Sequence, residues 1–365
     1  MKNMDKLMLV AILKHRFPLG LSYDDVLLIP QYSKIQSRSE VNLISQITPR
    51  IKLTLPITSA PMTDVTGVDM AIQLAKLGGL GFIPRFVSEE EQADMVYKVK
   101  KAKVLVGAAV GLRNDFIKRA EMLVKAGTDT ILLDVANGYM QKAIDATKIL
   151  KHLFGKSVDI MSGLVATSEG AENLFKAGAD CVHVGIGGGS ICTTRVTTGV
   201  GVPNITTIID TAKVARNFKK TIIIDAGAKN SGDIVKALAA GCSAVRTGNL
   251  LAGTKEAPGK LVIIKGKKYK EYKGSTSVTE KKFHLEKGVV FNRNYINHIE
   301  GVESLVPYKG TLENHLAIIV AGIKSGFSYC GARNLPELQR KAKFIRITPG
   351  GFTESNAHDV ILIKK

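Results

Sequence analysis

Short apolar runs that end at Gly, Ser or Asp recur along the chain, and valine and isoleucine are frequent in them. Continuous runs of this kind predict strands that are buried on both faces of a sheet. The eight predicted strands are Pro56–Ala60, Leu80–Ile83, Val104–Ala109, Thr130–Asp134, Val158–Ser162, Cys181–Gly185, Thr221–Asp225 and Ala244–Gly248. Segments with helical spacing lie between them, several of them followed by a glycine that is typical of a helix end. The predicted helices include Met70–Leu77, Arg113–Ala126, Tyr139–Leu153, Ala171–Ala177 and Asp233–Ala240.

The regular alternation of these strands and helices predicts an α/β fold of the (β/α)8 TIM-barrel type. A doubly wound open sheet is the alternative, but it normally has a glycine-rich turn after its first strand, and this chain has none there. We therefore predict a single catalytic barrel domain over residues 1–365. One wider step between strands, from Gly185 to Thr221, predicts a long loop at the functional end. The segment Lys260–Glu303 predicts an irregular, mobile, flap-like excursion.

Positive charge bears on the choice of partners. Lys and Arg together number 51 against 32 Asp and Glu, so the formal net charge is +19. The cations are 38 Lys and 13 Arg, whereas bidentate recognition of phosphates and bases favours Arg. Nine of the lysines lie in Lys260–Lys287, which we interpret as a solvated surface segment, with a polyanion-binding face as the alternative. Nucleic acid is therefore not the partner that we expect.

Hydropathy and cysteine usage favour a cytoplasmic protein. No run of about 18 apolar residues predicts a membrane span. The apolar run Leu7–Leu13 is short and lacks a small-residue cleavage site, so we expect no signal peptide. Cys181, Cys192, Cys242 and Cys330 are widely spaced and form neither a metal-binding nor a disulfide pattern, which favours a reducing compartment.

Candidate chemistry follows the sixth predicted strand, in the segment GIGGGSICTTR (Gly185–Arg195). Barrel enzymes carry their catalytic groups on the loops after the strands. Glycines allow a close approach of backbone N–H groups to an anion, and Ser190 adds a hydroxyl. Cys192 lies among polar and cationic residues that favour a reactive thiolate. The alternative is a tight turn that carries an inert thiol.

The loops after the seventh and eighth strands indicate a phosphate site. In this fold these two loops often bind phosphate, which predicts a nucleotide or a sugar phosphate as ligand. Asp225 is the last residue of the seventh predicted strand and is a candidate acceptor for ribose hydroxyls, while the neighbouring glycines approach the phosphate. Asp134 follows strand four in the segment DVANGY, and it is either functional or a loop-capping carboxylate.

Eight segments resemble the IMP dehydrogenase/GMP reductase family, and the similarity runs from about residue 18 to residue 362. They are Leu21–Pro30 (LSYDDVLLIP), Ser59–Met62 (SAPM), Val184–Pro203 (VGIGGGSICTTRVTTGVGVP), Ser231–Gly241 (SGDIVKALAAG), Leu250–Gly259 (LLAGTKEAPG), Val306–Gly310 (VPYKG), Tyr329–Ala332 (YCGA) and Phe352–Val360 (FTESNAHDV). The resemblance implies a barrel, a homotetramer, a purine nucleoside monophosphate substrate (GMP or IMP) and a nicotinamide cofactor.

The resemblance also implies roles for individual residues. Cys192 attacks C2 of the purine, and Thr194 with Glu300 forms a proton-handling pair. The residues implied in substrate binding are Met62, Gly189, Ser190, Asp225, Gly227, Gly248, Asn249, Gly274 and Ser275. Those implied in cofactor binding are Arg85, Asp134, Ala136, Asn137 and Gly138. A monovalent cation, K⁺, is implied at the carbonyls of Gly187, Gly189 and Cys192.

Several features favour the reductase branch of the family, which converts GMP to IMP with NADPH. The regulatory CBS modules that dehydrogenases usually carry are missing between Phe82 and Val104. The Arg-Tyr dipeptide with which dehydrogenases activate water has no counterpart between Gly274 and Glu300, where the nearest match is Arg293–Tyr295. The segment DVANGY is also of the reductase form. In contrast, SAPM, GGLGFI and the tail ESNAHDV resemble dehydrogenases, and Arg85 replaces the lysine of reductases.

The prediction is therefore a divergent GMP reductase that lacks CBS modules and uses NADPH. The first alternative is an IMP dehydrogenase that oxidises IMP to XMP with NAD. The second is a non-catalytic homologue that binds a nucleotide or a polyanion.

Overall fold

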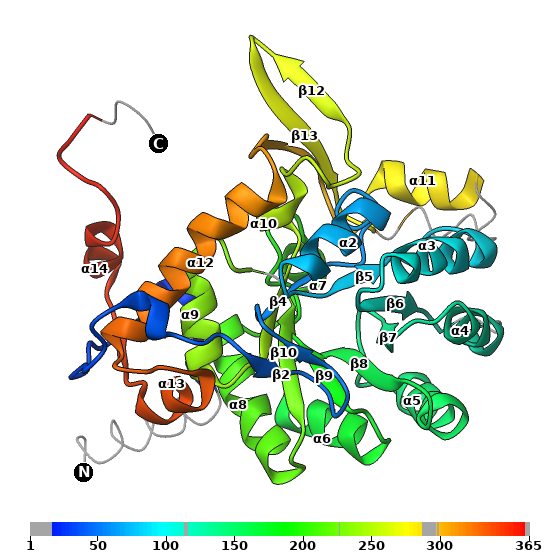
Figure 1. The fold of residues 1–365 in the computed structure, drawn as a ribbon, viewed down its shortest axis with the longest axis horizontal. Coiled ribbons are helices and arrows are strands. Elements are labelled where there is room, and N and C mark those ends of the chain that lie inside the picture. Colours follow the sequence, from blue (N-terminus) through cyan, green and yellow to red (C-terminus); the bar gives the residue numbers. More distant parts are fainter. Residues whose placement is uncertain (1–16, 113–115, 226, 287–296, 298, 362–365) are drawn as a thin grey trace, which may run out of the picture.

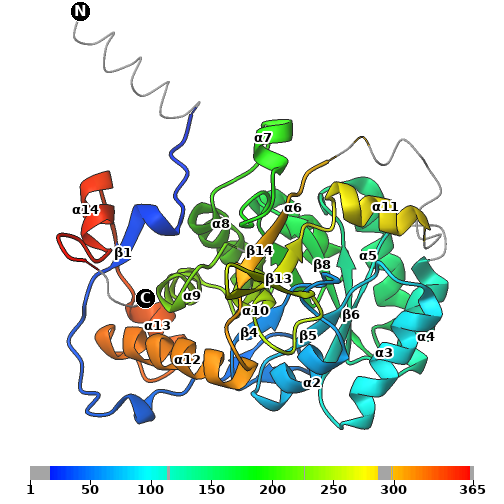
Figure 2. The same ribbon diagram turned by 90° about the horizontal axis from the view of Figure 1, so that it is seen from above.

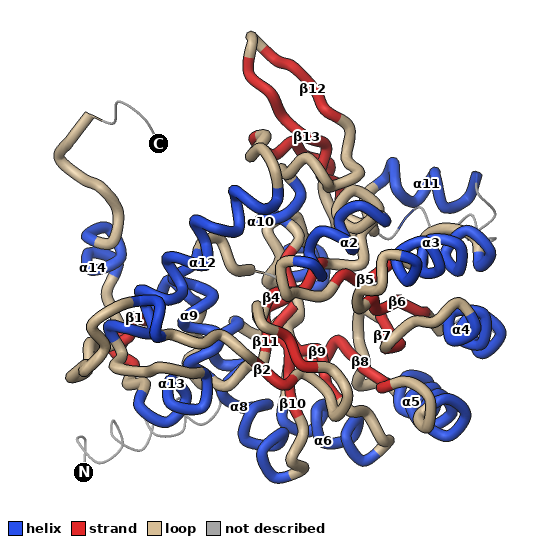
Figure 3. The backbone as a smooth tube through the Cα atoms, viewed as in Figure 1, coloured by secondary structure: helices blue, strands red, loops and turns tan. Residues whose placement is uncertain are grey.

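The computed structural model describes residues 17–112, 116–225, 227–286, 297 and 299–361. Eight parallel strands form its central sheet, in the order β4-β11-β10-β9-β8-β7-β6-β5. An isolated parallel bridge between Thr58 and Leu80 links the two edge strands, so the sheet is a nearly closed barrel. The predicted (β/α)8 fold is confirmed, and Figure 3 shows helices around the central strands. The apolar run Leu7–Leu13 lies outside the described residues.

The barrel strands match the eight predicted apolar runs to within a few residues. Their bounds are β4 Ile57–Ser59, β5 Gly81–Ile83, β6 Val106–Val110, β7 Thr130–Asp134, β8 Asp159–Val165, β9 Cys181–Val184, β10 Thr221–Asp225 and β11 Ala244–Thr247. All residues of β6 and β9 are buried, as expected for strands with the barrel interior on one face and helices on the other.

Helices cover the outside of the barrel (Figure 1). They are α2 Val68–Lys76, α3 Glu89–Lys101, α4 Phe116–Lys125, α5 Gln141–Phe154, α6 Ser168–Lys176, α8 Asn204–Asn217 and α9 Ser231–Ala240. Gly127 and Gly178 follow α4 and α6 with φ of 93° and 103°, a backbone conformation that glycine adopts without strain and that ends a helix. None of the helices in the described ranges combines the length and apolar character needed to span a bilayer.

The wide step between β9 and β10 contains two helices, α7 (Thr194–Thr198) and α8. The prediction of one long loop from Gly185 to Thr221 is therefore wrong for the part that α8 occupies. Threonines interrupt the apolar spacing of α8 in the sequence, yet its inner face is buried at Ile205, Ile208, Ala212 and Ala215.

The described part of Lys260–Glu303 is more regular than the sequence analysis predicts. A three-stranded antiparallel sheet of β12 (Leu261–Ile264), β13 (Lys267–Lys273) and β14 (Glu303–Pro307) extends from the barrel (Figure 1), and α11 (Val278–Glu286) follows β13. The exposed lysines of this segment cluster on the β12–β13 hairpin, which agrees with a solvated surface. The mobility of the segment stays a prediction.

The remaining elements frame the barrel. The hairpin of β2 (Ser45–Gln46) and β3 (Lys52–Leu53) lies at the end at which the barrel strands begin. The hydroxyl of Thr221, the first residue of β10, donates to the Ile47 carbonyl of this hairpin. Strand β1 (Val26–Leu28) pairs with β15 (Phe344–Arg346), and Figure 2 shows α14 beside them, on the side away from α3 and α4. The other short elements are η1 Tyr23–Asp25, η2 Arg38–Glu40 and α10 Asn249–Ala252, and the C-terminal helices are α12 Leu312–Tyr329, α13 Leu335–Lys341 and α14 Pro349–Glu354.

Candidate active site

The glycine-rich turn after β9 places Cys192 at the open end of the barrel. Gly185 and Gly187 have φ of 117° and 76°, which explains the glycines at these positions. The Cys192 N–H donates to the Gly189 carbonyl over 3.2 Å and closes the turn. A bridge between Cys192 and Gly301 then joins this turn to the chain before β14. Two segments that are far apart in the sequence therefore meet at the thiol.

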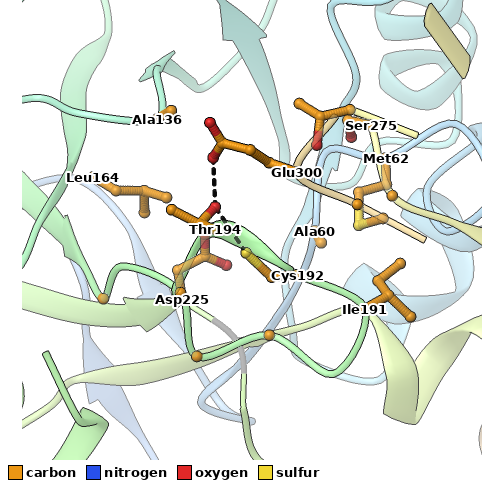
Figure 4. Close-up of a pocket in the computed structure, with 18 of the residues that line it drawn as sticks. Ala60, Met62, Ala136, Leu164, Ile191, Cys192, Thr194, Asp225, Ser275 and Glu300 are labelled. Atoms are coloured by element: carbon orange, nitrogen blue, oxygen red, sulfur yellow. Dashed lines mark hydrogen bonds between the residues drawn. The ribbon is translucent and has the colours of Figure 1, made fainter. Parts of the chain in front are cut away.

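A hydrogen-bonded relay connects Cys192 to a carboxylate. The Cys192 thiol donates to the Thr194 hydroxyl (Sγ–Oγ1 3.2 Å), and this hydroxyl donates to Glu300 (Oγ1–Oε2 2.6 Å). Figure 4 shows the three side chains in line at the cavity. The predicted pairing of Thr194 with Glu300 is thus present in the geometry. A proton that leaves the thiol has a direct path to the Glu300 carboxylate.

Burial separates Cys192 from the other three cysteines. Cys192 is partly exposed, whereas Cys181, Cys242 and Cys330 are buried. Burial raises the pKa of Cys181 to about 12 and also raises the pKa of Cys242 and of Cys330. Because the thiolate is the nucleophilic form, these three buried thiols are poor nucleophiles.

Twelve of the predicted site residues line a single cavity of about 240 Å³ around the thiol. They are Met62, Asp134, Ala136, Gly187, Gly189, Cys192, Thr194, Asp225, Gly248, Gly274, Ser275 and Glu300. The loops after β4, β7, β9, β10 and β11 and the segments on either side of α11 bring them together. The cavity has the apolar walls and the few convergent polar groups that are typical of a small-molecule site.

Three further predicted substrate residues, Ser190, Gly227 and Asn249, line a second cavity of about 220 Å³. Tyr272 borders both cavities, so they adjoin. Burial raises the pKa of Tyr272 to about 12, although a hydrogen bond with Ser190 lowers it, so the phenol stays protonated and can donate. A Cβ on Gly248 would lie 2.5 Å from the Tyr272 hydroxyl, which explains the glycine at this position.

A third cavity, of about 370 Å³, lies on the other side of the relay. It shares Ala136, Ile186, Thr194 and Glu300 with the first cavity. The predicted cofactor residue Asn137 lines it, together with the apolar side chains of Val165, Val200 and Val202. A flat ring bound there would be next to the relay and to the first cavity.

Two of the predicted cofactor residues lie outside these three cavities. Arg85 pairs with Asp134 (Nε–Oδ2 3.4 Å), and its guanidinium lies 4.2 Å from the centre of the Phe86 ring. Gly138 donates its N–H to the Leu164 carbonyl over 2.6 Å. Both residues therefore support the loops after β5 and β7, and direct contact with a cofactor stays a prediction for them.

The turn that is predicted to bind K⁺ has a fixed positive charge beside it. The Arg195 guanidinium donates to the Val202 carbonyl over 2.7 Å, and a Cβ on Gly187 would lie 2.5 Å from Arg195 Cγ. The Gly189 carbonyl accepts the Cys192 N–H but keeps a second lone pair for a cation. Potassium binding by this turn stays a prediction.

Among the residues that line the first cavity, Arg246, Tyr272, Leu164 and Thr276 were given no role from the sequence. Of these, Arg246 gives a signal in the sequence, because it is a single cation within the apolar run of β11. A charged residue at a buried strand position indicates a specific partner.

The comparisons with known proteins agree with this site. Residues 20–358 match the family model described as IMP dehydrogenase / GMP reductase domain. The chain belongs to this family, a class of oxidoreductases of purine metabolism that share this barrel.

Individual relatives come from both branches of the family. The IMP dehydrogenase of Borreliella burgdorferi is 37% identical over an alignment of 401 positions, which covers 94% of this chain and 98% of the relative. That of Nitrosopumilus maritimus is 33% identical over an alignment of 475 positions, which covers 95% of this chain and 100% of the relative. Among solved structures, a GMP reductase from Trypanosoma brucei in complex with guanosine 5′-monophosphate has a TM-score of 0.89 and 29% identity, with 95% of this chain and 99% of that chain covered.

Proposed function

We propose that this protein is a GMP reductase, which converts GMP to IMP and ammonia with NADPH through a covalent bond between Cys192 and C2 of the purine. The observation that carries the proposal is the relay from Cys192 through Thr194 to Glu300, because it can take a proton from the thiol and return one to a leaving amine. A purine nucleotide fits the fold, since the Trypanosoma brucei relative with a TM-score of 0.89 is in complex with guanosine 5′-monophosphate.

The two adjoining cavities suit the two ends of a nucleoside monophosphate. The base lies beside Cys192 in the first cavity, and the ribose hydroxyls reach the Asp225 carboxylate there. The phosphate lies toward the second cavity, where Ser190 and Tyr272 supply hydroxyl donors. Backbone N–H groups of the turn at Gly189 and of Gly248 complete this part of the site, and glycine permits the close approach.

Proton transfer in the first half of the reaction follows from the relay. Glu300 takes the thiol proton through Thr194, and the thiolate forms a bond to C2. Glu300 then returns a proton along the same path to the 2-amino group, and the carbon–nitrogen bond breaks to release ammonia. Cys192 stays bonded to C2 until its carbon–sulfur bond breaks, which releases IMP and restores the thiolate.

The third cavity fits a nicotinamide cofactor, because its apolar wall of Val165, Val200 and Val202 suits a flat ring next to Glu300. Ala136 and Asn137 would border the cofactor, and Asp134 lies at the cavity that holds the base. When bound, the cofactor supplies the hydride that replaces the amino group at C2. In this chain the hydrogen bond between them keeps Thr194 and Glu300 in position beside the third cavity.

The choice of reductase over dehydrogenase rests on the missing hydrolytic group. A dehydrogenase must activate water, which the family does with an adjacent Arg-Tyr pair, and the segment between Gly274 and Glu300 contains no such pair. Arg293–Tyr295, the nearest match, lies outside the described residues. IMP dehydrogenase is the second candidate, because curated relatives with 33–37% identity carry that name.

The proposal also includes the cytoplasm as location, which hydropathy and cysteine usage favour, and a homotetramer as assembly, which the family resemblance implies. Size-exclusion chromatography with light scattering tests the assembly. A non-catalytic polyanion-binding role predicts retention of the protein by nucleic acid at physiological salt in a mobility assay, and no retention would remove that alternative.

Absorbance at 340 nm distinguishes the two branches. One cuvette holds the protein with GMP and NADPH, and the other holds it with IMP and NAD. We expect absorbance to fall in the first and to stay constant in the second. An increase in the second alone would make the protein a dehydrogenase. The variant Cys192→Ala should lose turnover and keep nucleotide affinity. Replacement of K⁺ by Na⁺ in the same assay tests whether turnover depends on K⁺.

A further inference from the structure

A buried arginine lies beneath the site, and neither proposed half-reaction uses it. Arg246 is on β11, and its side chain is 1% exposed. In the parallel register of the barrel, Arg246 is the direct neighbour of Asp225 on β10. A guanidinium removed from water in this way is tolerated only with a partner of opposite charge.

Arg246 holds both oxygens of the Asp225 carboxylate. Its Nε donates to Oδ1 over 2.8 Å, and its Nη2 donates to Oδ2 over 2.6 Å. This two-pronged geometry fixes the plane of the carboxylate as well as its position. Nη2 also lies 3.9 Å from Oδ1 of Asp134, the carboxylate that pairs with Arg85. Asp225 thus belongs to a charged network that is anchored in the strands of the barrel.

The Asp225 carboxylate faces the cavity while Arg246 holds it from below. Its side chain is 17% exposed and is one of those that line the cavity in Figure 4. Each carboxylate oxygen has about two acceptor sites, so one on each oxygen is left for a ligand after Arg246 has bound. Two acceptors held at a fixed spacing match two neighbouring hydroxyls, such as the 2′- and 3′-hydroxyls of ribose.

We propose that Arg246 is a positioning residue that presents the Asp225 carboxylate to the ribose diol and makes the protein select ribonucleotides over 2′-deoxyribonucleotides. The inference rests on the proposed nucleotide site, and it extends that proposal by a determinant of substrate class. An acceptor that is already fixed need not reorganise on binding. A ligand without the 2′-hydroxyl leaves one oxygen of the Asp225 carboxylate without a hydrogen bond, and the resulting loss of binding free energy makes the protein prefer ribonucleotides.

The contacts of Arg246 allow a specific set of variants. Arg246 Nη1 is buried and has no hydrogen-bond partner among the described residues, so Arg246→Met removes chiefly the contacts to Asp225 and Asp134. Arg246→Lys keeps the charge but loses the two-pronged geometry. The double variant Asp225→Asn/Arg246→Met removes both charges together, which a protein interior tolerates better than one unpaired charge.

Isothermal titration calorimetry measures the affinity for GMP against 2′-deoxyGMP and for IMP against 2′-deoxyIMP. The proteins compared are the wild type, Arg246→Met, Arg246→Lys, Asp225→Asn and the double variant. In the wild type we expect the ribonucleotide to bind roughly ten- to a hundredfold more tightly than its deoxy form, the range for one hydrogen bond to a charged group. Arg246→Met should reduce this ratio to within about threefold, and Arg246→Lys should give an intermediate ratio. The double variant should be no less selective than Asp225→Asn, because Arg246 acts through Asp225.

Each failure has a distinct meaning. A ribonucleotide-to-deoxyribonucleotide affinity ratio in Arg246→Met equal to that of the wild type would overturn the inference while the proposed function stands. Wild-type binding of IMP with no binding of GMP would contradict the reductase, and the IMP pair would still measure the ratio. Absence of any purine nucleotide binding to the wild type would overturn both. If Arg246→Met does not fold, as judged by circular dichroism, Arg246→Lys decides, because a ratio equal to that of the wild type would overturn the inference and a reduced ratio would support it.

Discussion

Replacement of Asp64 by asparagine should stabilise the folded protein at neutral pH. Asp64 lies in the loop after β4 and is buried against the end of β13, where its Oδ2 accepts the Lys273 N–H over 3.1 Å. Burial raises the pKa of this carboxyl from 3.8 to about 6, with Lys273 acting against the rise and Glu280 adding to it. Asparagine has the same shape and keeps an oxygen for the Lys273 N–H, but it carries no charge.

The expected gain follows from the two pKa values. A carboxyl whose pKa is raised in the folded state contributes its full stability below pH 3.8 and loses it as the pH rises through about 6. The difference between these values corresponds to about 3 kcal/mol, at about 1.4 kcal/mol for each pH unit. The ionised carboxylate of Asp64 therefore costs about 3 kcal/mol at about pH 8. At about pH 5, where the folded carboxyl is mostly protonated, the cost is about half as large.

Urea unfolding followed by far-UV circular dichroism at these two pH values tests the reasoning. We expect Asp64→Asn to exceed the wild type in free energy of unfolding by about 3 kcal/mol at about pH 8 and by about half of that at about pH 5. Asp359→Asn is the matched control, because the Asp359 side chain is 95% exposed and its loss should change neither value. A difference that is independent of pH, or a less stable Asp64→Asn at about pH 8, would refute the account.

Two further predictions concern the relay and the thiols. Thr194→Val should lower kcat by about a hundredfold or more with GMP affinity retained, and Thr194→Ser should recover most of the rate, as measured by absorbance at 340 nm. Equal rates for the two variants would show that the hydroxyl moves no proton. Iodoacetamide at about pH 8 should modify Cys192 first and leave Cys181 and Cys242 unmodified, because burial raises their pKa values. Peptide mass spectrometry measures this, and faster labelling of Cys181 would contradict the assignment.

Local sequence patterns predicted most of the barrel because each strand is buried on both faces. Such burial requires a continuous apolar run, and the runs are visible without any knowledge of their neighbours. The helix α8 was missed because threonines within its apolar spacing obscure the helical period. The hairpin β12–β13 was missed because its many lysines resemble a solvated loop, although β13 pairs with strands on both sides.

The candidate site was predictable where motifs fall at the ends of strands. Parallel strands of a barrel all end at the same rim, so residues that follow them converge whatever their separation in the sequence. Twelve of the predicted residues line one cavity for this reason. Arg246 and Tyr272 escaped prediction because their roles depend on neighbours that lie on other strands or loops.

The sequence by itself determined the fold class and the glycine-rich turn, and it made Cys192 a candidate nucleophile, because each depends on local motifs and spacing. Only the tertiary structure decided which groups are in contact. Thr194 and Glu300 are 106 positions apart, and the family resemblance paired them, but their 2.6 Å contact depends on how the chain before β14 packs against the turn after β9. Arg246 and Asp225 are 21 positions apart and meet through the register of two strands. Hydrogen bonds and ion pairs form over a few ångströms in space, so chain folding, rather than distance along the sequence, selects the partners.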